Sequence, residues 1–175
     1  YEIPLRLVGS EMCIRDSLYI ESCASKISTT QQHIGKPDKL LFSFHGIPQS
    51  YVCQDEPYQS QCLVTASLIA KKLNLDESQY EVAFQSRFGK AEWIKPYLSS
   101  RLEELPQEGI YNIHVFCPGF SSDCLETIDE IGRESKEEFF EHGGKSFEFI
   151  SCLNSEESFI NALMNIQKKA DIKIL

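Results

Sequence analysis

The residue with the clearest chemical potential is a histidine that ends an apolar run. His45 follows the segment 40–44, "LLFSF", and precedes Gly46 and the turn at Pro48. An imidazole titrates near pH ~6.5, so it can accept a proton or bind a divalent metal ion. For a lone histidine, hydrogen bonds to nearby backbone carbonyls would be the more ordinary interpretation. A functional role therefore depends on what lies beside it.

An acidic segment, residues 123–142, is the second candidate. On a helix at about 100° per residue, one stripe carries seven carboxylates: Asp123, Glu126, Glu130, Glu134, Glu137, Glu138 and Glu141. The opposite face carries Leu125, Ile128, Ile131 and Phe139. A solvated acidic face needs no function. However, like charges three and four positions apart repel, and the helix dipole disfavours anions near its C-terminus, so a cation would relieve both penalties.

An imidazole beside such a stripe would form a mixed nitrogen and oxygen site. These ligands suit Fe(II) or a similar divalent ion. The same groups can accept protons near neutral pH. Metal entry and proton removal could therefore share one site.

Alternating strand and helix patterns indicate how these residues are positioned. Strands are predicted at 40–44, 80–84, 110–116 and 146–150, and helices at 18–34, 58–73, 90–105, 123–142 and 155–169. This alternation predicts an α/β fold in three layers, a four-stranded parallel sheet with helices on both faces. The carboxyl ends of the strands then share the edge where ligands bind. His45 lies at that edge.

Composition limits the possible functions. The chain has 175 residues, is 42% hydrophobic and carries a net charge of −9, which fits one domain and argues against a nucleic-acid surface. The seven cysteines form no CxxC pair, so neither a disulfide framework nor a zinc ribbon is expected. No membrane-spanning run or secretory signal is visible, so we expect a cytoplasmic protein.

The first residues do not fit the pattern of the rest. Residues 1–17 show neither helical nor strand periodicity, and "LRLVGSEMCIRDS" is similar to a translated sequencing adapter. We therefore expect segment 1–17 to be non-native and 18–175 to form one domain. The upstream part of the parent protein is expected to be missing.

Several strings, taken in order, resemble a known family. They are "LLFSFHGIP", "DEPYQSQC", "FQSRFGKAEWIKPY", "CPGFSSDCLETIDEI" and "GGKSFEFISCLN". From about residue 19 to 154 the chain is similar to the C-terminal half of ferrochelatase, the terminal enzyme of haem synthesis. The resemblance implies a Rossmann-like chelatase fold of two similar domains with porphyrin between them. Only the second domain is present here.

The resemblance also implies a reaction. Fe(II) would enter a free-base porphyrin, either protoporphyrin IX or coproporphyrin III, with release of two protons. Fe(II) is then a substrate, and no prosthetic group is needed. The tail after Asn154 lacks a cysteine cluster, so no iron–sulfur cluster is predicted.

Residue roles follow from the matching strings. His45 and Glu126 would be catalytic and metal-binding, and Glu130 and Glu134 would be further metal ligands that pass cations inward or protons outward. The resemblance implies that their helix is wound more widely than an α-helix. Porphyrin contacts would come from Trp93, Gln85 and Ser86, although core packing is the alternative for Trp93.

Two other functions stay open. One is a chelatase for another divalent metal, and the other is a non-catalytic tetrapyrrole or metal-binding module, which would not need His45. The expected partners are porphyrin and Fe(II), without nucleic acid. A peripheral membrane contact, the oligomeric state and the activity of this polypeptide alone are left open.

Overall fold

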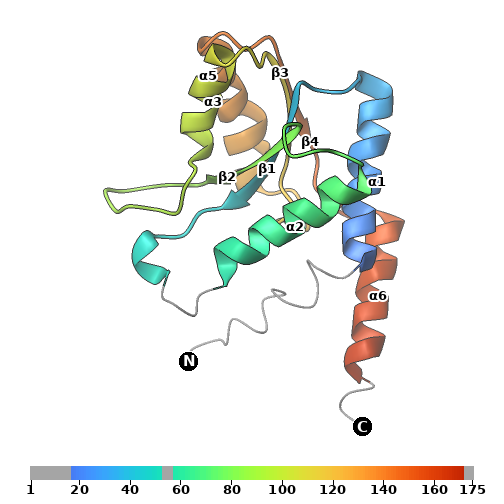
Figure 1. The fold of residues 1–175 in the computed structure, drawn as a ribbon. Helices are drawn as coiled ribbons and strands as arrows, with labels where there is room; N and C mark the ends of the chain where they lie inside the picture. The colour runs from blue at the N-terminus through green and yellow to red at the C-terminus, as the bar shows by residue number, and fades with distance from the viewer. Residues whose placement is uncertain (1–16, 53–56, 172–175) are drawn as a thin grey trace.

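A computed structural model describes residues 17–52 and 57–171, so the expectation for segment 1–17 lies outside the described residues except at Ser17. Its centre is a four-stranded sheet in the order β2-β1-β3-β4 (Figure 1). The strands are β1 (Lys39–His45), β2 (Tyr80–Gln85), β3 (Asn112–Phe116) and β4 (Ser146–Ile150). All neighbouring pairs are parallel. The predicted α/β class and parallel sheet are confirmed.

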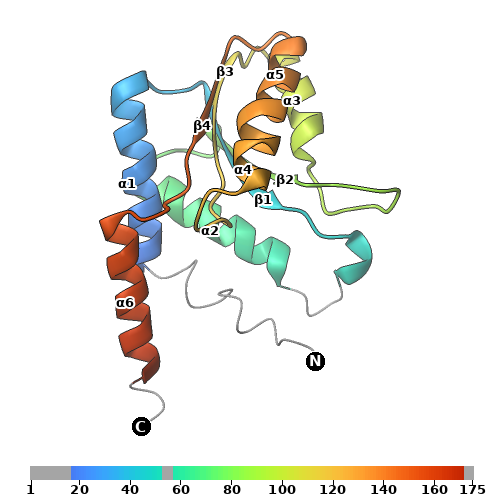
Figure 2. The ribbon, with the colours of Figure 1, turned by 180° about the vertical axis from the view of Figure 1, so that it is seen from behind.

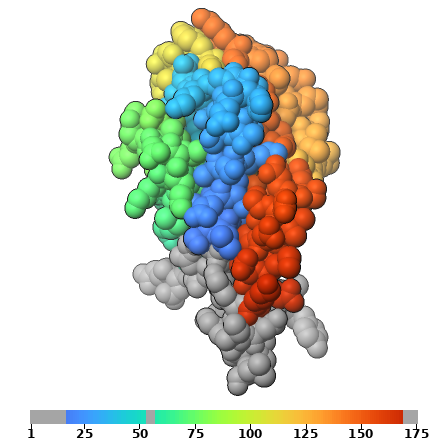
Figure 3. All heavy atoms as spheres, turned by 90° about the vertical axis from the view of Figure 1, so that its right-hand side faces the viewer, coloured from blue at the N-terminus to red at the C-terminus, as the bar shows by residue number. Residues whose placement is uncertain are grey.

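Helices cover both faces of this sheet (Figures 1 and 2). One face packs α1 (Ser17–Ile34), α2 (Tyr58–Lys72) and α6 (Glu157–Asp171). Figure 3 shows α1 lying between α2 and α6 on this face. The other face packs α3 (Leu98–Gln107) and α5 (Lys136–Glu141). Alternate strand residues supply the two cores, Leu40 and Phe42 to the first and Leu41 to the second, as the two-residue period of a strand requires.

One predicted helix begins later than expected. The pattern predicted a helix over 90–105, but α3 begins at Leu98. Pro96 lacks an N–H group and disfavours helical backbone in the residue before it, so the helix starts beyond it. The preceding segment instead pairs with the loop after β1, through Ile94 N–H to the Ile47 carbonyl at 3.0 Å. Trp93 therefore lies on a bridge to Pro48 and not at a helix start.

The acidic segment does not form one continuous α-helix. It consists of α4 (Leu125–Ile128), a π-helix at Glu130–Ser135, and α5. The wider winding was implied by the family resemblance. Because the winding changes, the stripe drawn at one constant angle per residue is wrong in detail. Leu125 and Ile128, predicted on the apolar face, are 77% and 59% exposed.

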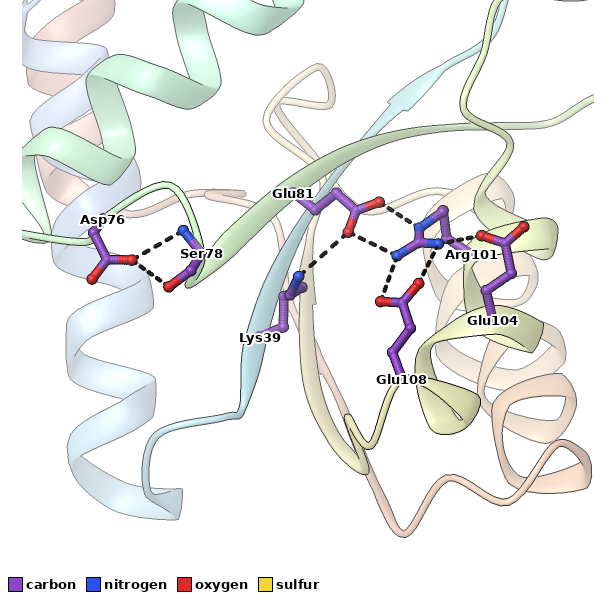
Figure 4. A network of polar contacts seen from close by, with 7 residues as sticks. All are labelled: Lys39, Asp76, Ser78, Glu81, Arg101, Glu104 and Glu108. Carbon is purple, nitrogen blue, oxygen red and sulfur yellow. Dashed lines mark hydrogen bonds and ion pairs between the residues drawn. The ribbon is translucent and has the colours of Figure 1, made fainter.

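A network of charges joins the start of the sheet to α3 (Figure 4). Arg101 on α3 bonds both oxygens of Glu81 on β2 and also binds Glu104 and Glu108. Lys39 at the start of β1 lies 3.7 Å from the same Glu81 carboxylate. These contacts fix α3 against the amino ends of β1 and β2.

Hydropathy adds one further observation. No helix within residues 17–52 and 57–171 is long and apolar enough to cross a lipid bilayer.

Candidate active site

The carboxyl edge of the sheet brings together the two residues of greatest chemical interest. His45 is the last residue of β1, and Glu126 lies in the first turn of α4, which follows β3. His45 Nε2 and Glu126 Oε1 are 3.9 Å apart. The side chains are 41% and 50% exposed. The structure thus places the imidazole and the carboxylate on one open rim, as the parallel sheet predicts.

A backbone contact determines which nitrogen of His45 carries the proton. Nδ1 lies 2.6 Å from the Gly46 carbonyl oxygen, and a carbonyl can only accept a hydrogen bond, so Nδ1 donates. In the neutral ring the lone pair is then on Nε2, the atom that faces Glu126. Two electron-pair donors therefore face each other across a gap that a proton or a metal cation would stabilise.

The backbone around His45 is held in place by its neighbours. The Tyr58 hydroxyl donates to the His45 carbonyl oxygen at 2.7 Å. The rings of Trp93 and Phe120 lie 6.4 and 6.5 Å from the imidazole centre. Gly46 allows close packing, because a Cβ there would lie 2.9 Å from the Gln85 carbonyl oxygen and 3.1 Å from the Trp93 ring. These contacts therefore restrict the position of the His45 backbone and ring.

Gln85, predicted to contact porphyrin, lies inside the protein. It ends β2 and is 3% exposed. Its side chain bonds Ser43 and the Glu126 backbone. In this structure its side chain contacts protein groups behind the His45–Glu126 pair. Its contact with porphyrin stays a prediction.

Ser86 and Glu130 form a two-point contact between the end of β2 and the π-helix. The backbone N–H of Ser86 donates to one carboxylate oxygen at 2.6 Å, and its hydroxyl donates to the other at 2.7 Å. Ser86 adopts a φ of 63°, in the left-handed region that non-glycine residues rarely enter. Glu130 is thus held by the protein itself, while its predicted metal contact remains to be tested.

Internal counter-charge reduces the repulsion expected along the acidic segment. Arg133 binds Asp129, Glu134 and Glu137 at 2.6, 3.0 and 3.4 Å. Arg133 thus supplies part of the counter-charge that the sequence analysis assigned to a cation. Glu138 is not among the acids that Arg133 binds. Burial raises the pKa of its carboxyl group, and the nearby Glu103 and Glu141 raise it further.

Two cavities run along the exposed side of the π-helix. One of about 200 Å³ is lined by residues of β2, α3, the π-helix and α5, among them Glu130, Glu134 and Glu138. The other, of about 410 Å³, is lined by Glu126, Glu130 and Glu134 and by the exposed side chains of Phe88 and Leu125. Both include Ser86 and Arg87. The two cavities thus form an acidic groove, which is lined by Glu130 and Glu134 along its length and by Glu126 in the second cavity.

The four predicted metal ligands do not assemble into one centre. Within the described residues, no three His, Cys, Asp or Glu side chains are grouped so that they could hold a metal ion. His45 and Glu126 face each other, whereas Glu130 is bound by Ser86 and Glu134 by Arg133. The arrangement is a facing pair followed by acids that other protein groups bind, and their predicted metal contacts stay predictions.

Trp93 is both a packing residue and a neighbour of the site. Its side chain is buried, and the Phe88 ring meets it edge-on at 5.1 Å. The indole Nε1 has no hydrogen-bond partner among the described residues. Most of the Trp93 side chain is therefore packed against the protein, as the core-packing alternative expects. Its contact with porphyrin stays a prediction.

The sequence reasoning missed the residues that anchor the loop before α4. Asp123 accepts hydrogen bonds from the Cys152 N–H at 2.9 Å and from the Asn154 side chain at 2.7 Å, which joins the exits of β3 and β4. Cys124 and Thr127 form a reciprocal capping box at the start of α4. The available signal was the polar sequence just before the helix, where side chains usually cap free N–H groups.

Comparisons with known proteins point to one family. The family model described as Ferrochelatase matches residues 11–171. A protein named ferrochelatase from Idiomarina loihiensis is 47% identical over 150 residues, which cover 86% of this chain and 41% of the relative. Ferrochelatases from a Janthinobacterium strain and from Alcanivorax borkumensis are 46% and 45% identical, over 85% of this chain and 40% and 43% of theirs. The chain thus spans about two fifths of the length of these relatives.

Proposed function

Because this chain belongs to the ferrochelatase family, we propose that it supplies the catalytic pair of an enzyme that inserts Fe(II) into a free-base porphyrin. The single observation that carries the proposal is the 3.9 Å approach of His45 Nε2 to Glu126 Oε1 on an open rim. The porphyrin would be protoporphyrin IX or coproporphyrin III. The chain would act as part of a longer protein whose other domain forms the opposing wall of the porphyrin site.

Metallation of a porphyrin exchanges two N–H protons for one divalent ion, so the enzyme must accept protons while it delivers metal. In our proposal His45 Nε2 accepts a proton from a pyrrole nitrogen, because Nδ1 already donates to Gly46. The Glu126 carboxylate then stabilises the imidazolium that forms. His45 then releases this proton to solvent and accepts the second pyrrole proton in turn, since both side chains are half exposed.

Delivery of Fe(II) would use the acidic groove. Hydrated Fe(II) must lose water before it reaches the ring, and carboxylate oxygens can replace that water one ligand at a time. Glu134 and Glu130 line both cavities, and Glu126 lies at the end nearer His45. We propose that the ion passes along these acids in that order.

The porphyrin itself would rest against the aromatic and aliphatic rim. Phe88 and Leu125 are exposed beside the second cavity, and Trp93 packs edge-on against Phe88. An apolar wall can hold the macrocycle in a puckered form that resembles the metallation transition state. A cytoplasmic location and the lack of a resident prosthetic group or iron–sulfur cluster remain part of the proposal.

The test is anaerobic metallation by the longer protein that carries this chain, followed by the visible spectrum of the porphyrin. We expect Fe(II) insertion that is lost when His45→Ala is introduced. Porphyrin binding without turnover would support the non-catalytic module instead. Preferential insertion of another divalent ion would support a chelatase for that metal.

A further inference from the structure

Gln85 connects the two halves of the catalytic pair. It lies beside His45 in the register of β1 and β2, and its backbone carbonyl accepts the Gly46 N–H at 2.9 Å. Its side-chain Nε2 donates to the Glu126 carbonyl oxygen at 2.8 Å. One buried residue thus contacts the strand exit that carries the imidazole and the helical turn that carries the carboxylate.

The orientation of the Gln85 amide is fixed by two donors. The Ser43 hydroxyl donates to Oε1 at 2.7 Å, and the Cys117 thiol approaches the same oxygen at 3.5 Å. Burial raises the pKa of Cys117, so its sulfur keeps the proton that it donates. With the oxygen held on this side, the amide nitrogen must face Glu126, because a carbonyl oxygen can only accept.

The bond from Gln85 helps to fix the position of Glu126. Glu126 sits in a helix of four residues, and the winding changes to a π-helix at Glu130. The capping box and the Asp123 bonds hold the residues just before and after Glu126, but they do not reach the strand that lies beside His45. The bond from Gln85 supplies a fixed point outside the helix at the residue whose carboxylate faces His45.

We propose that Gln85 is a positioning residue that sets the separation between His45 Nε2 and Glu126 Oε1, and thereby the affinity of this pair for a divalent ion. The inference rests on the proposed function, since it assigns to the pair the handling of metal. Gln85 acts through Glu126 and does not itself touch the ion. Hydrogen-bonding partners behind a metal ligand commonly change metal affinity by about 10- to 100-fold.

The decisive substitution is Gln85→Glu. It preserves size and keeps an oxygen for Ser43 and Cys117, but it places a second acceptor against the Glu126 carbonyl. Gln85→Met is the second variant, because it removes the donor without adding a buried charge. Gln32→Glu is the matched control, since Gln32 is exposed on α1 and this change alters net charge equally.

Trp93 provides the signal in the 175-residue chain, which contains one tryptophan. Its ring lies 6.4 Å from that of His45, so an open-shell ion bound to His45 should quench its fluorescence. Co(II) alone, added without porphyrin, is the probe. Thermal melting followed by circular dichroism identifies which variants are folded at the temperature of the titration.

We expect Co(II) to bind about 10-fold more weakly to Gln85→Glu and to Gln85→Met, and with unchanged affinity to Gln32→Glu. In a Glu126→Gln background, the Gln85 substitutions should cause no further loss. If one of them fails to fold, the other decides.

Other outcomes separate this inference from the proposed function. Unchanged affinity in a folded Gln85 variant, while His45→Ala abolishes quenching, would overturn the positioning role and leave the proposed function intact. A full additional loss in the Glu126→Gln background would also overturn the positioning role. If Co(II) does not quench the unsubstituted chain, or if His45→Ala leaves quenching unchanged, both the proposed function and the inference fail.

Discussion

The two ends of the sheet treat charged side chains in opposite ways. At the amino end, Arg101 is 15% exposed and bonds three carboxylates, including both oxygens of Glu81. At the carboxyl end, His45 and Glu126 are about half exposed and meet at 3.9 Å without a hydrogen bond between them. One set of charges is satisfied by the protein, and the other is left available.

The difference indicates which charges stabilise the fold and which can do chemistry. A partly buried arginine with several partners orders the elements that carry them, because each bond would be lost if an element moved. A half-exposed pair with a loose contact adds little stability. It can instead exchange a proton or admit an ion without disrupting the fold.

The largest effect is expected from breaking the carboxyl-end pair. Glu126→Ala in the longer protein should lower the rate of Fe(II) insertion by about 10³-fold, since it removes a group that assists proton transfer. The free energy of unfolding of this chain should change little, because the Glu126 side chain is half exposed and its contacts with His45 and the Cys124 thiol are long. Steady-state turnover and urea unfolding measure the two quantities. A stability loss that matches the activity loss would contradict the comparison.

Removing the amino-end cation should have the reverse effect. Arg101→Ala should lower the free energy of unfolding by about 3 kcal/mol, because it leaves Glu81 partly buried without its main partner. Arg133→Ala is the matched control, since its ion pairs are exposed, and it should cost below about 1 kcal/mol. Urea unfolding of both variants measures the two losses in free energy of unfolding. Equal losses would show that burial of the ion pairs does not determine their contribution to stability.

Asp123 is a charge at the carboxyl end that the protein does bind, so it can be compared with the nearby His45–Glu126 pair. Burial raises its pKa, but hydrogen bonds from Asn154 and from the Cys152 N–H outweigh this, so its pKa lies below the usual range. A lowered pKa gives stability that is present above the unfolded value of ~3.9 and is lost as pH falls through the folded value. Asp123→Asn should therefore be less stable by about 1 to 2 kcal/mol at neutral pH.

The pH dependence provides the check. Measured by urea unfolding, the difference between the two proteins should shrink as pH falls below ~4. A difference that stays constant across this range would mean that the Asp123 charge makes no contribution.

The smallest effect is expected at Ser86. Ser86→Ala removes the hydroxyl that bonds Glu130 but keeps the backbone N–H bond to the same carboxylate. We expect a loss of about 1 kcal/mol in the free energy of unfolding and a small change in turnover. A loss of turnover as large as that of Glu126→Ala would mean that Glu130 and not Glu126 limits metal insertion.

Local sequence patterns predicted the sheet because each strand is a short apolar run and each helix follows a turn. The predicted strand at 146–150 coincides with β4, and α1 differs from its prediction by one residue. The prediction of a helix from residue 90 was wrong, because the spacing of apolar residues carries no information on the backbone restriction at Pro96. There the chain pairs with the loop after β1, a contact between distant segments that no local pattern reveals.

The candidate site was predictable to a similar degree. The shared edge of a parallel sheet predicted that His45 would lie near the acidic helix. The exposure of Leu125 and Ile128 and the bond from Ser86 to Glu130 depend on the π-helix, which a constant angle per residue cannot represent. Gln85 was assigned to porphyrin because it matches a family string, and that match did not reveal that its side chain is buried in this structure.

The central claim is that His45 and Glu126 act as a unit. The most direct measurement is the anaerobic rate of Fe(II) insertion by the longer protein with His45→Ala, Glu126→Ala and both substitutions together. If the pair shares one proton-transfer step, the double variant should be no slower than the slower single variant. Either single variant turning over at the unsubstituted rate, or fully multiplicative losses in the double variant, would contradict the account.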